Sequence, residues 1–198
     1  MYRLITLMIT LSIITSLHAQ DEFPAPFGLS WDTTTTEIKD LGFTKSQGDE
    51  IIAWTGVNVP KAWSKGKTYI LLTYQDKLVK ASVLSESISG DITGSEGKEL
   101  YEEMKALLTK KYGEPKDSME AVGRSVYKDY DEFYQCLDYD GCGIYISAFY
   151  VAGGYISIQL IGTSRGSGYL QVSYEPPAFG EAKRAIEQAK AETDDDAF

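Results

Sequence analysis

Histidine is nearly absent from this chain of 198 residues, and its single copy is His18. That residue lies in an N-terminal stretch typical of an export signal, so removal of the signal would leave a mature chain without imidazole. The lack of imidazole excludes Ser-His-Asp and Cys-His catalysis and any zinc site built on histidine. We therefore expect no metal site and no cofactor.

Basic residues are also scarce, because 19 Lys and Arg stand against 29 Asp and Glu, for a formal net charge of −10. A chain this acidic repels phosphate backbones, so nucleic acid is not an expected partner. Beyond residue 20 the sequence has no apolar run near the roughly 20 residues that a spanning helix needs. We expect no stable membrane insertion of the mature chain.

The first 19 residues have the order of a secretory signal. Arg3 is a positive start, Leu4–Leu17 is an apolar stretch interrupted only by Thr and Ser, and Ala19 is a small residue at the cleavage position. The alternative is a retained anchor, for which the stretch is marginal in length. We expect a signal peptide at 1–19, a single α+β domain at 20–193, an acidic flexible tail at 194–198 and a periplasmic or secreted location.

The only two cysteines are Cys136 and Cys142. An even count in an exported chain favours a disulfide, and the turn residues between the two cysteines indicate a bridge across a hairpin. The alternative is a redox motif, which is normally C-x-x-C, whereas this spacing is C-x5-C.

Three helices are predicted. Thr34 and Glu37 form a capping box at the start of a short helix that ends at Gly42. The residues 95–112 carry one apolar stripe at helical spacing, and 179–193 is an alanine-rich helix. Strands are predicted at 27–31, 51–54, 68–74, 77–84, 125–130, 133–138, 143–150, 155–162 and 169–174.

No internal repeat is visible, and the short connections between consecutive strands force antiparallel pairing. We predict an α+β fold with a curved antiparallel sheet of about six to eight strands. The long helix and the C-terminal helix would pack on one face of that sheet and leave the other face open.

The chain has 14 tyrosines, and they cluster in its second half. Alternation along two predicted strands places Tyr145 with Phe149 on one face of the first, and Tyr169 with Gln171 on one face of the second. Such aromatic faces stack on sugars or anchor proteins, and Trp63 in the lysine-rich loop 61–67 offers a further contact. The candidate binding residues are Tyr145, Phe149, Tyr169 and Trp63. The alternative is that tyrosines suit half-buried strands and that the loop is solvated.

Carboxylates are the only acid–base groups in good supply. A pair of them at the right separation hydrolyses glycosidic bonds without histidine. The candidates are Glu86, Asp91, Asp129, Asp131, Glu132 and Glu175, and the alternative is solvated surface charge.

Three motifs carry a family resemblance. They are Phe27-Gly28-Leu29-Ser30-Trp31, the helix end Lys111-Tyr112-Gly113-Glu114-Pro115, and the late stretch from Gly168-Tyr169 to Tyr174-Glu175. Together they resemble a family of small exported bacterial proteins without an assigned activity, so the resemblance implies export and no site residues. The residues 33–43 also resemble the start of small envelope-assembly proteins.

Taken together, the sequence favours a soluble, exported, non-enzymatic protein that binds a protein or glycan of the cell envelope. Enzymatic activity stays open. The alternatives are a carboxylate-based hydrolase acting on envelope glycans and an accessory to envelope assembly.

Overall fold

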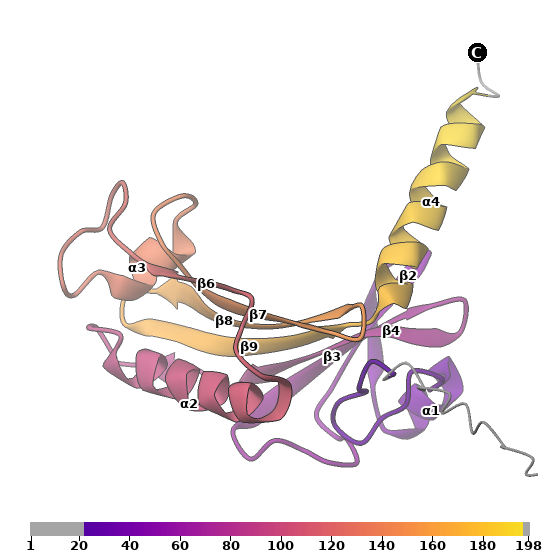
Figure 1. Cartoon of the computed structure of the whole chain (residues 1–198), viewed down its shortest axis with the longest axis horizontal. Coiled ribbons are helices and arrows are strands. Elements are labelled where there is room, and N and C mark those ends of the chain that lie inside the picture. Colours follow the sequence, from indigo (N-terminus) through magenta and orange to yellow (C-terminus); the bar gives the residue numbers. More distant parts are fainter. Residues whose placement is uncertain (1–21, 196–198) are drawn as a thin grey trace, which may run out of the picture.

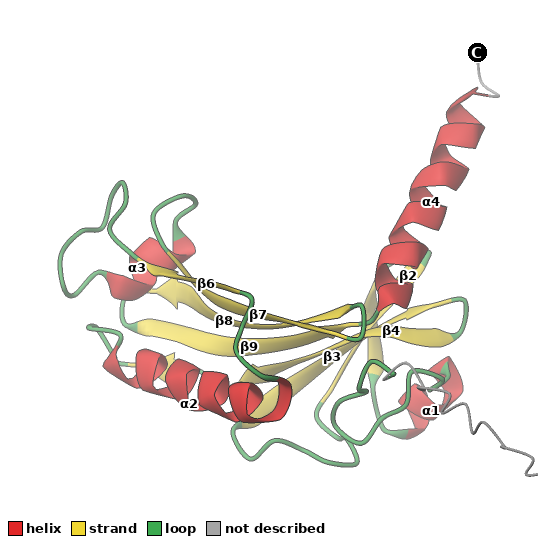
Figure 2. Cartoon of the chain, in the orientation of Figure 1, coloured by secondary structure: helices red, strands yellow, loops and turns green. Residues whose placement is uncertain are grey.

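The computed structural model of the chain describes residues 22–195. The expected signal at 1–19 and the last three residues of the expected tail lie outside the described residues. Within them the fold is α+β, as predicted: one antiparallel sheet with four helices (Figures 1 and 2).

The helices are α1 (Thr35–Asp40), α2 (Ser95–Tyr112), α3 (Phe133–Asp138) and α4 (Pro177–Asp195). The strands are β1 (Thr44–Gln47), β2 (Ile51–Gly56), β3 (Gly66–Tyr74), β4 (Lys77–Ser85), β5 (Ile88–Ser89), β6 (Asp117–Ala121), β7 (Ile144–Val151), β8 (Gly154–Ser164) and β9 (Ser167–Glu175).

The strand order contains a repeat that the sequence does not reveal. The order across the sheet is β1-β2-β3-β4-β9-β8-β7-β6, with the two-residue β5 added beside β9. Each half of the sheet is therefore a helix followed by four antiparallel strands, first α1 with β1 to β4 and then α2 with β6 to β9. The halves meet where β4 pairs antiparallel with β9.

The core lies between the sheet and the two helices that open the halves. Along β8 and β9 every second side chain is buried, as the period of two in a strand requires. Tyr101, Met104 and Leu108 of α2 and Ile38 of α1 are buried against this face. Figure 1 shows α1 and α2 on the same side of the sheet.

The C-terminal helix α4 differs from the prediction, because it does not share the face of α2. Its Phe179 ring lies 5.2 Å from Lys80 Nζ, and Lys80 belongs to the opposite face of β4. Among the described side chains of α4, Phe179 and Ala182 are buried, and Figure 1 shows the rest of the helix rising away from the sheet. The helix also continues to Asp195, two residues into the expected tail.

Three predicted strands are not strands. The stretch 27–31 is a turn, in which Phe27 and Gly28 both have positive φ. The stretch 125–130 is irregular, and 133–138 is α3, whose Phe133, Tyr134 and Leu137 have helical spacing and face inward. The edge strands β1 and β6 were not predicted, because their side chains are nearly all exposed and lack an apolar alternation.

A buried carboxylate joins α2 to α3. The N-cap residue of α2 is Gly94, which has no side chain to cap the helix. Asp91 does this instead, since it accepts hydrogen bonds from the Ser95 N–H (2.8 Å) and the Gly97 N–H (3.1 Å). The Tyr134 hydroxyl of α3 donates a third bond of 2.9 Å to the same carboxylate, which is only 6% exposed. Negative charge at a helix N-terminus is also favoured by the helix dipole.

We predict that Asp91→Ala lowers the free energy of unfolding by about 2–4 kcal/mol, because it leaves three donors without their acceptor, two of them buried. Tyr134→Phe, which removes one donor, should lose about 1 kcal/mol. Glu99→Ala, on the exposed side of the same helix, is the matched control. Urea unfolding followed by circular dichroism measures all three, and an Asp91→Ala loss no larger than that of the control would contradict this role.

The predicted capping box of α1 is present. The Glu37 N–H donates to Thr34 Oγ1 (3.3 Å), and the Thr34 N–H donates to the Glu37 carboxylate (2.8 Å). The hydrogen bonds from the Thr34 backbone and hydroxyl lower the pKa of Glu37 below its ordinary value of 4.5. Because the folded-state pKa is lowered, the stabilisation is present above the ordinary value and is lost as pH falls through the lowered one.

Thr34→Ala should therefore return the pKa of Glu37 toward its ordinary value and destabilise the protein by about 1 kcal/mol at neutral pH. Carboxyl NMR titration checks the first effect and urea unfolding the second. Thr36→Ala is the control: Thr36 is exposed and lies two residues after Thr34, so its replacement should leave the Glu37 titration unchanged. Equal Glu37 titration curves in the wild type and Thr34→Ala would refute the capping box.

Candidate functional site

The face of the sheet away from α2 is the largest surface that the helices leave uncovered, and we call it the open face. The strand registers show which side chains share it, because directly paired residues point to the same side. Within residues 22–195, Figure 1 shows no helix lying along its middle. Its uncharged side chains include those of Ile70, Leu72, Ser82, Leu84, Met119, Ile144, Ile146, Tyr150, Tyr155, Ser157, Gln159, Ile161, Tyr169, Gln171 and Ser173, and its charged ones include Lys80, Asp117 and Glu175.

The open face mixes aliphatic, aromatic and amide side chains, most of them half-buried. Tyr150 and Tyr155 lie opposite each other on β7 and β8, with their rings edge to face at 5.4 Å. Tyr150 is 56% exposed, and burial raises the pKa of the Tyr155 phenol. The Tyr155 phenol is therefore neutral at physiological pH, and the hydroxyls of both tyrosines can form a hydrogen bond with a bound molecule.

Polar groups at the centre of the open face satisfy one another. The Ser82 and Ser173 hydroxyls are 2.9 Å apart, and Gln171 Nε2 donates to Ser173 Oγ at 3.0 Å. Lys80 and Glu175 form an ion pair of 2.5 Å at one side of this row. These contacts leave the amides of the row partly free to bond with another molecule.

Each end of the open face is hollowed. At one end Tyr155 and Glu175 line a hollow of about 300 Å³ with Phe179, Lys183 and Arg184 of α4. At the other end Ile144 and Gln159 line a second hollow of about 300 Å³, together with Met119, Arg124 and Tyr139. The open face is thus continuous with the start of α4 and with the segment that joins β6 to β7.

That segment, residues 122–143, is here called the insertion, since it adds α3 between two otherwise adjacent strands. The predicted disulfide Cys136–Cys142 is present. It does not span a hairpin, however, because Cys136 lies in α3 and Cys142 in the turn before β7. The bridge ties the end of α3 to the start of β7.

The four binding residues predicted from the sequence do not come together. Phe149 is 1% exposed, and Tyr145 stacks on Tyr101 of α2 at 5.5 Å, so both belong to the covered face. Tyr169 lies on the open face, paired with Ile161. Strand alternation separates the two faces correctly but does not say which face a helix covers. The prediction took the face of Tyr145 and Phe149 to be the uncovered one, whereas α2 covers it.

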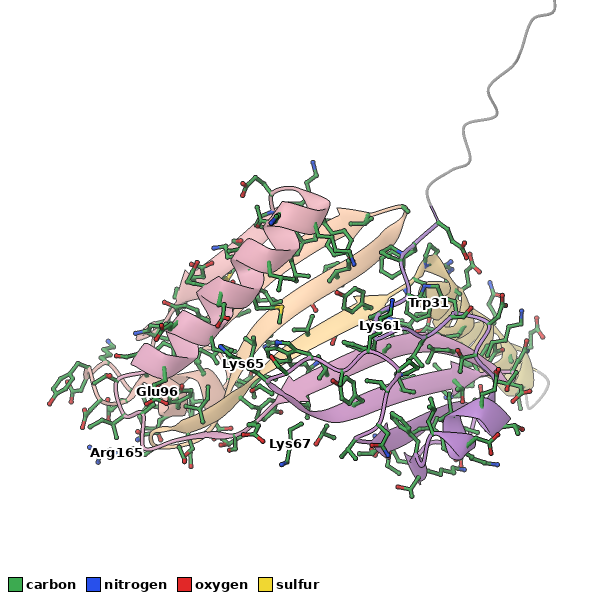
Figure 3. The ribbon with its side chains drawn as sticks, turned by 90° about the horizontal axis from the view of Figure 1, so that it is seen from below. Trp31, Lys61, Lys65, Lys67, Glu96 and Arg165 are labelled. Atoms are coloured by element: carbon green, nitrogen blue, oxygen red, sulfur yellow. A yellow bond between two sulfur atoms is a disulfide. The ribbon has the colours of Figure 1, made fainter. Side chains whose placement is uncertain are left out.

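Trp63 lies apart from the open face, in the loop between β2 and β3. It is half-buried against the core, and its backbone N–H donates to the Tyr69 hydroxyl at 2.9 Å. Figure 3 views the helix-bearing face and shows Lys61, Lys65 and Lys67 spread along this loop rather than gathered. Lys65 pairs with a glutamate of α2, and Lys67 pairs with one after β4 at 3.3 Å. The loop therefore offers little net positive charge.

Five of the six candidate carboxylates, all except Asp129, have structural partners. Asp91 caps α2, Glu175 pairs with Lys80, and Asp131 pairs with Arg165. Glu86 pairs with Lys67, and Glu132 accepts from the Asp129 N–H at 3.1 Å. Across the described residues, no group of three or more His, Cys, Asp and Glu could hold a metal ion.

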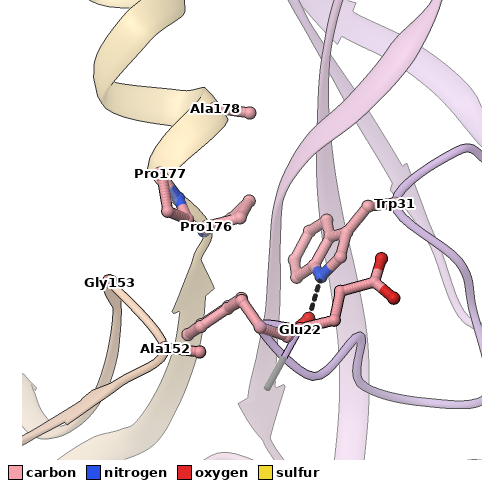
Figure 4. Close-up of a pocket in the computed structure, with 8 residues that line it drawn as sticks. Glu22, Trp31, Ala152, Gly153, Pro176, Pro177 and Ala178 are labelled. Atoms are coloured by element: carbon pink, nitrogen blue, oxygen red, sulfur yellow. Dashed lines mark hydrogen bonds between the residues drawn. The ribbon is translucent and has the colours of Figure 1, made fainter. Parts of the chain in front are cut away.

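A further hollow, of about 760 Å³, lies beside the start of α4 (Figure 4). Phe23, Trp31 and Pro176 give it apolar walls, and Glu22 is its only carboxylate. The Trp31 Nε1–H donates a hydrogen bond of 2.9 Å to the Phe23 carbonyl. With a single acid and few free polar groups, this hollow offers no acid–base pair for catalysis.

Between residues 22 and 195, none of the helices is both long and apolar enough to cross a membrane. Comparison with protein-family models, curated proteins and solved structures finds no match for the chain. The resemblance to small exported proteins thus stays a prediction, and the function has to be argued from the surface described above.

We predict that replacing both cysteines by alanine lowers the free energy of unfolding by about 2 kcal/mol, as expected for a seven-residue loop in the chain-entropy model. The insertion should also become the fastest-exchanging part of the protein in hydrogen exchange. Reduction of the wild type is the matched control and should give the same loss. Unchanged exchange in the insertion after reduction would show that the bridge does not hold this segment.

Proposed function

We propose that this chain is an exported binding protein whose open face docks a protein partner. The observation that supports the proposal is the uneven cover of the sheet: helices bury one face, while the other keeps aliphatic and aromatic side chains half-exposed. Contiguous exposed apolar surface of this kind marks interaction sites in soluble proteins.

The composition of the open face also fits a protein interface. Such interfaces combine an apolar centre and aromatic residues with hydrogen-bonding groups, and they are depleted in charge at the centre. The row that contains Leu84, Gln171, Gln159 and Ile146 has this mixture and no charge. The charged groups Lys80, Glu175 and Arg184 lie toward the margin, at the foot of α4.

Binding has more support than glycan hydrolysis. A hydrolase needs two carboxyl groups roughly 5–10 Å apart in a cleft, one of them held protonated. Among the described residues, the open face carries Glu175, which is engaged with Lys80, and Asp117, which is exposed on the edge strand β6 and does not line the hollow that contains Glu175. No observation favours an accessory role in envelope assembly over binding to one partner.

Photo-crosslinking in the native cells tests the proposal. A benzoyl-phenylalanine placed at Ile161, on the open face, should form a discrete crosslink to another protein. The same probe at Leu107, which is 53% exposed on α2, should not. Mass spectrometry identifies the product, and a crosslink to the chain itself would assign the face to a homo-oligomer. Equal labelling at both positions, or none at either, would contradict the proposal.

A further inference from the structure

We infer that the insertion is the main recognition element for the partner and that it fits a basic protein surface, bearing exposed Lys and Arg side chains. This inference rests on the proposed function and names the chemistry of the partner. It draws on three features of residues 119–143: exposed apolar side chains, a backbone held in place and an excess of carboxylates.

Exposed large hydrophobic side chains concentrate at this end of the molecule. Tyr130 is 80% exposed and Tyr139 is 52% exposed. Scattered exposed apolar residues need no explanation, but a concentration within about twenty residues marks a contact surface. The members of this group are Met119, Val122, Val126, Tyr127, Tyr130 and Tyr139.

The backbone of the insertion is fixed rather than loose. The disulfide ties α3 to the start of β7, and the Arg124 N–H donates to the Cys142 carbonyl at 3.0 Å. Tyr127 has a φ of 50°, an uncommon conformation for a bulky residue, and its ring packs edge-on against Tyr139 at 5.8 Å. The aromatic rings are therefore held at the surface before any partner arrives, which lowers the entropy lost on binding.

The charge of the insertion selects the partner. Its acidic residues are Asp129, Asp131, Glu132, Asp138 and Asp140, against Arg124 and Lys128. Asp131 already pairs with Arg165, whereas Asp138 and Asp140 are exposed and have no salt bridge within the described part of the chain.

Tyrosine rings beside free carboxylates are the groups that bind Lys and Arg. A guanidinium or ammonium group stacks on the ring face and pairs with the carboxylate at the same time. A neutral glycan would gain hydrogen bonds but no charge–charge attraction from the carboxylates, and an anionic one would be repelled. The chain's net charge of −10 acts in the same direction, since it steers a basic partner toward the protein.

The insertion and the open face can engage one partner together. The hollow at the β7 end of the open face is lined by Tyr139 and Arg124 from the insertion and by Met119, Ile144 and Gln159 from the strands. The surface of the insertion is therefore continuous with the open face, and a partner bound to the tyrosines can contact both.

Selection of a random peptide display library on the mature, disulfide-bonded protein tests the inference. The enriched peptides should be rich in Lys and Arg, and their binding should weaken as salt is raised. The triple variant Tyr127→Ser, Tyr130→Ser, Tyr139→Ser should lose at least about tenfold in affinity, as hot-spot residues do. Leu107→Ser, an exposed apolar side chain on α2 away from both the insertion and the open face, is the matched control and should keep its affinity.

Further variants and binding measurements test the charge of the insertion and the class of ligand. Asp138→Asn with Asp140→Asn should reduce the salt dependence and leave the fold intact by near-ultraviolet circular dichroism. Peptides without basic bias, no enrichment at all, or binding that the triple variant retains would overturn the inference. The crosslink at Ile161 would still stand in those cases, so the proposed function would survive. Tyrosine-dependent binding of a neutral glycan on an array would assign the insertion to sugars and also overturn it.

Discussion

A sheet of nine strands has two faces, and within residues 22–195 the helices cover one of them and only the margin of the other, where α4 begins. Side chains alternate between the faces at every residue, so a sequence that makes one face fully apolar leaves the other with whatever composition function requires. Here the other face has serine and glutamine at its centre, where Ser82 bonds to Ser173 across two strands and Gln171 bonds to Ser173 along one strand. It also keeps isoleucine, leucine and tyrosine around them. That composition is too apolar for a purely solvated surface and too polar for a hidden core.

The covered face and the exposed insertion are held in place by the same carboxylate. Asp91 ends the loop before α2, caps that helix and accepts the hydroxyl hydrogen of Tyr134 in α3. Tyr134 in turn packs so closely over Gly97 and Gly168 that a Cβ at either position would collide with its side chain. The start of α3 is therefore fixed by the core, and its end is fixed by the disulfide. Residues at the surface of the insertion are positioned by groups that no partner touches.

Local signals in the sequence were enough for the elements that depend on local chemistry. The capping box at Thr34, the helix 95–112, the Gln75-Asp76 hairpin and the disulfide were all predictable, since each depends on residues close in the chain. The candidate site depended on tertiary information. Tyr145 and Phe149 alternate just as open-face residues do, and only the position of α2 decides that they are buried. The repeat of a helix and four strands was hidden because the two halves share a topology and no residue pattern, and because the insertion interrupts the second half.

The negative charge links the open face to the choice of partner. An uncovered face with exposed isoleucine and tyrosine would favour association between copies of the same chain. Two copies that each carry a charge of −10 repel one another, and the repulsion is strongest where carboxylates gather, as at the insertion beside the open face. The same charge that opposes self-association attracts a basic surface. In the proposed function, the open face supplies apolar contacts, the tyrosines of the insertion supply anchoring side chains and the negative charge favours a basic partner.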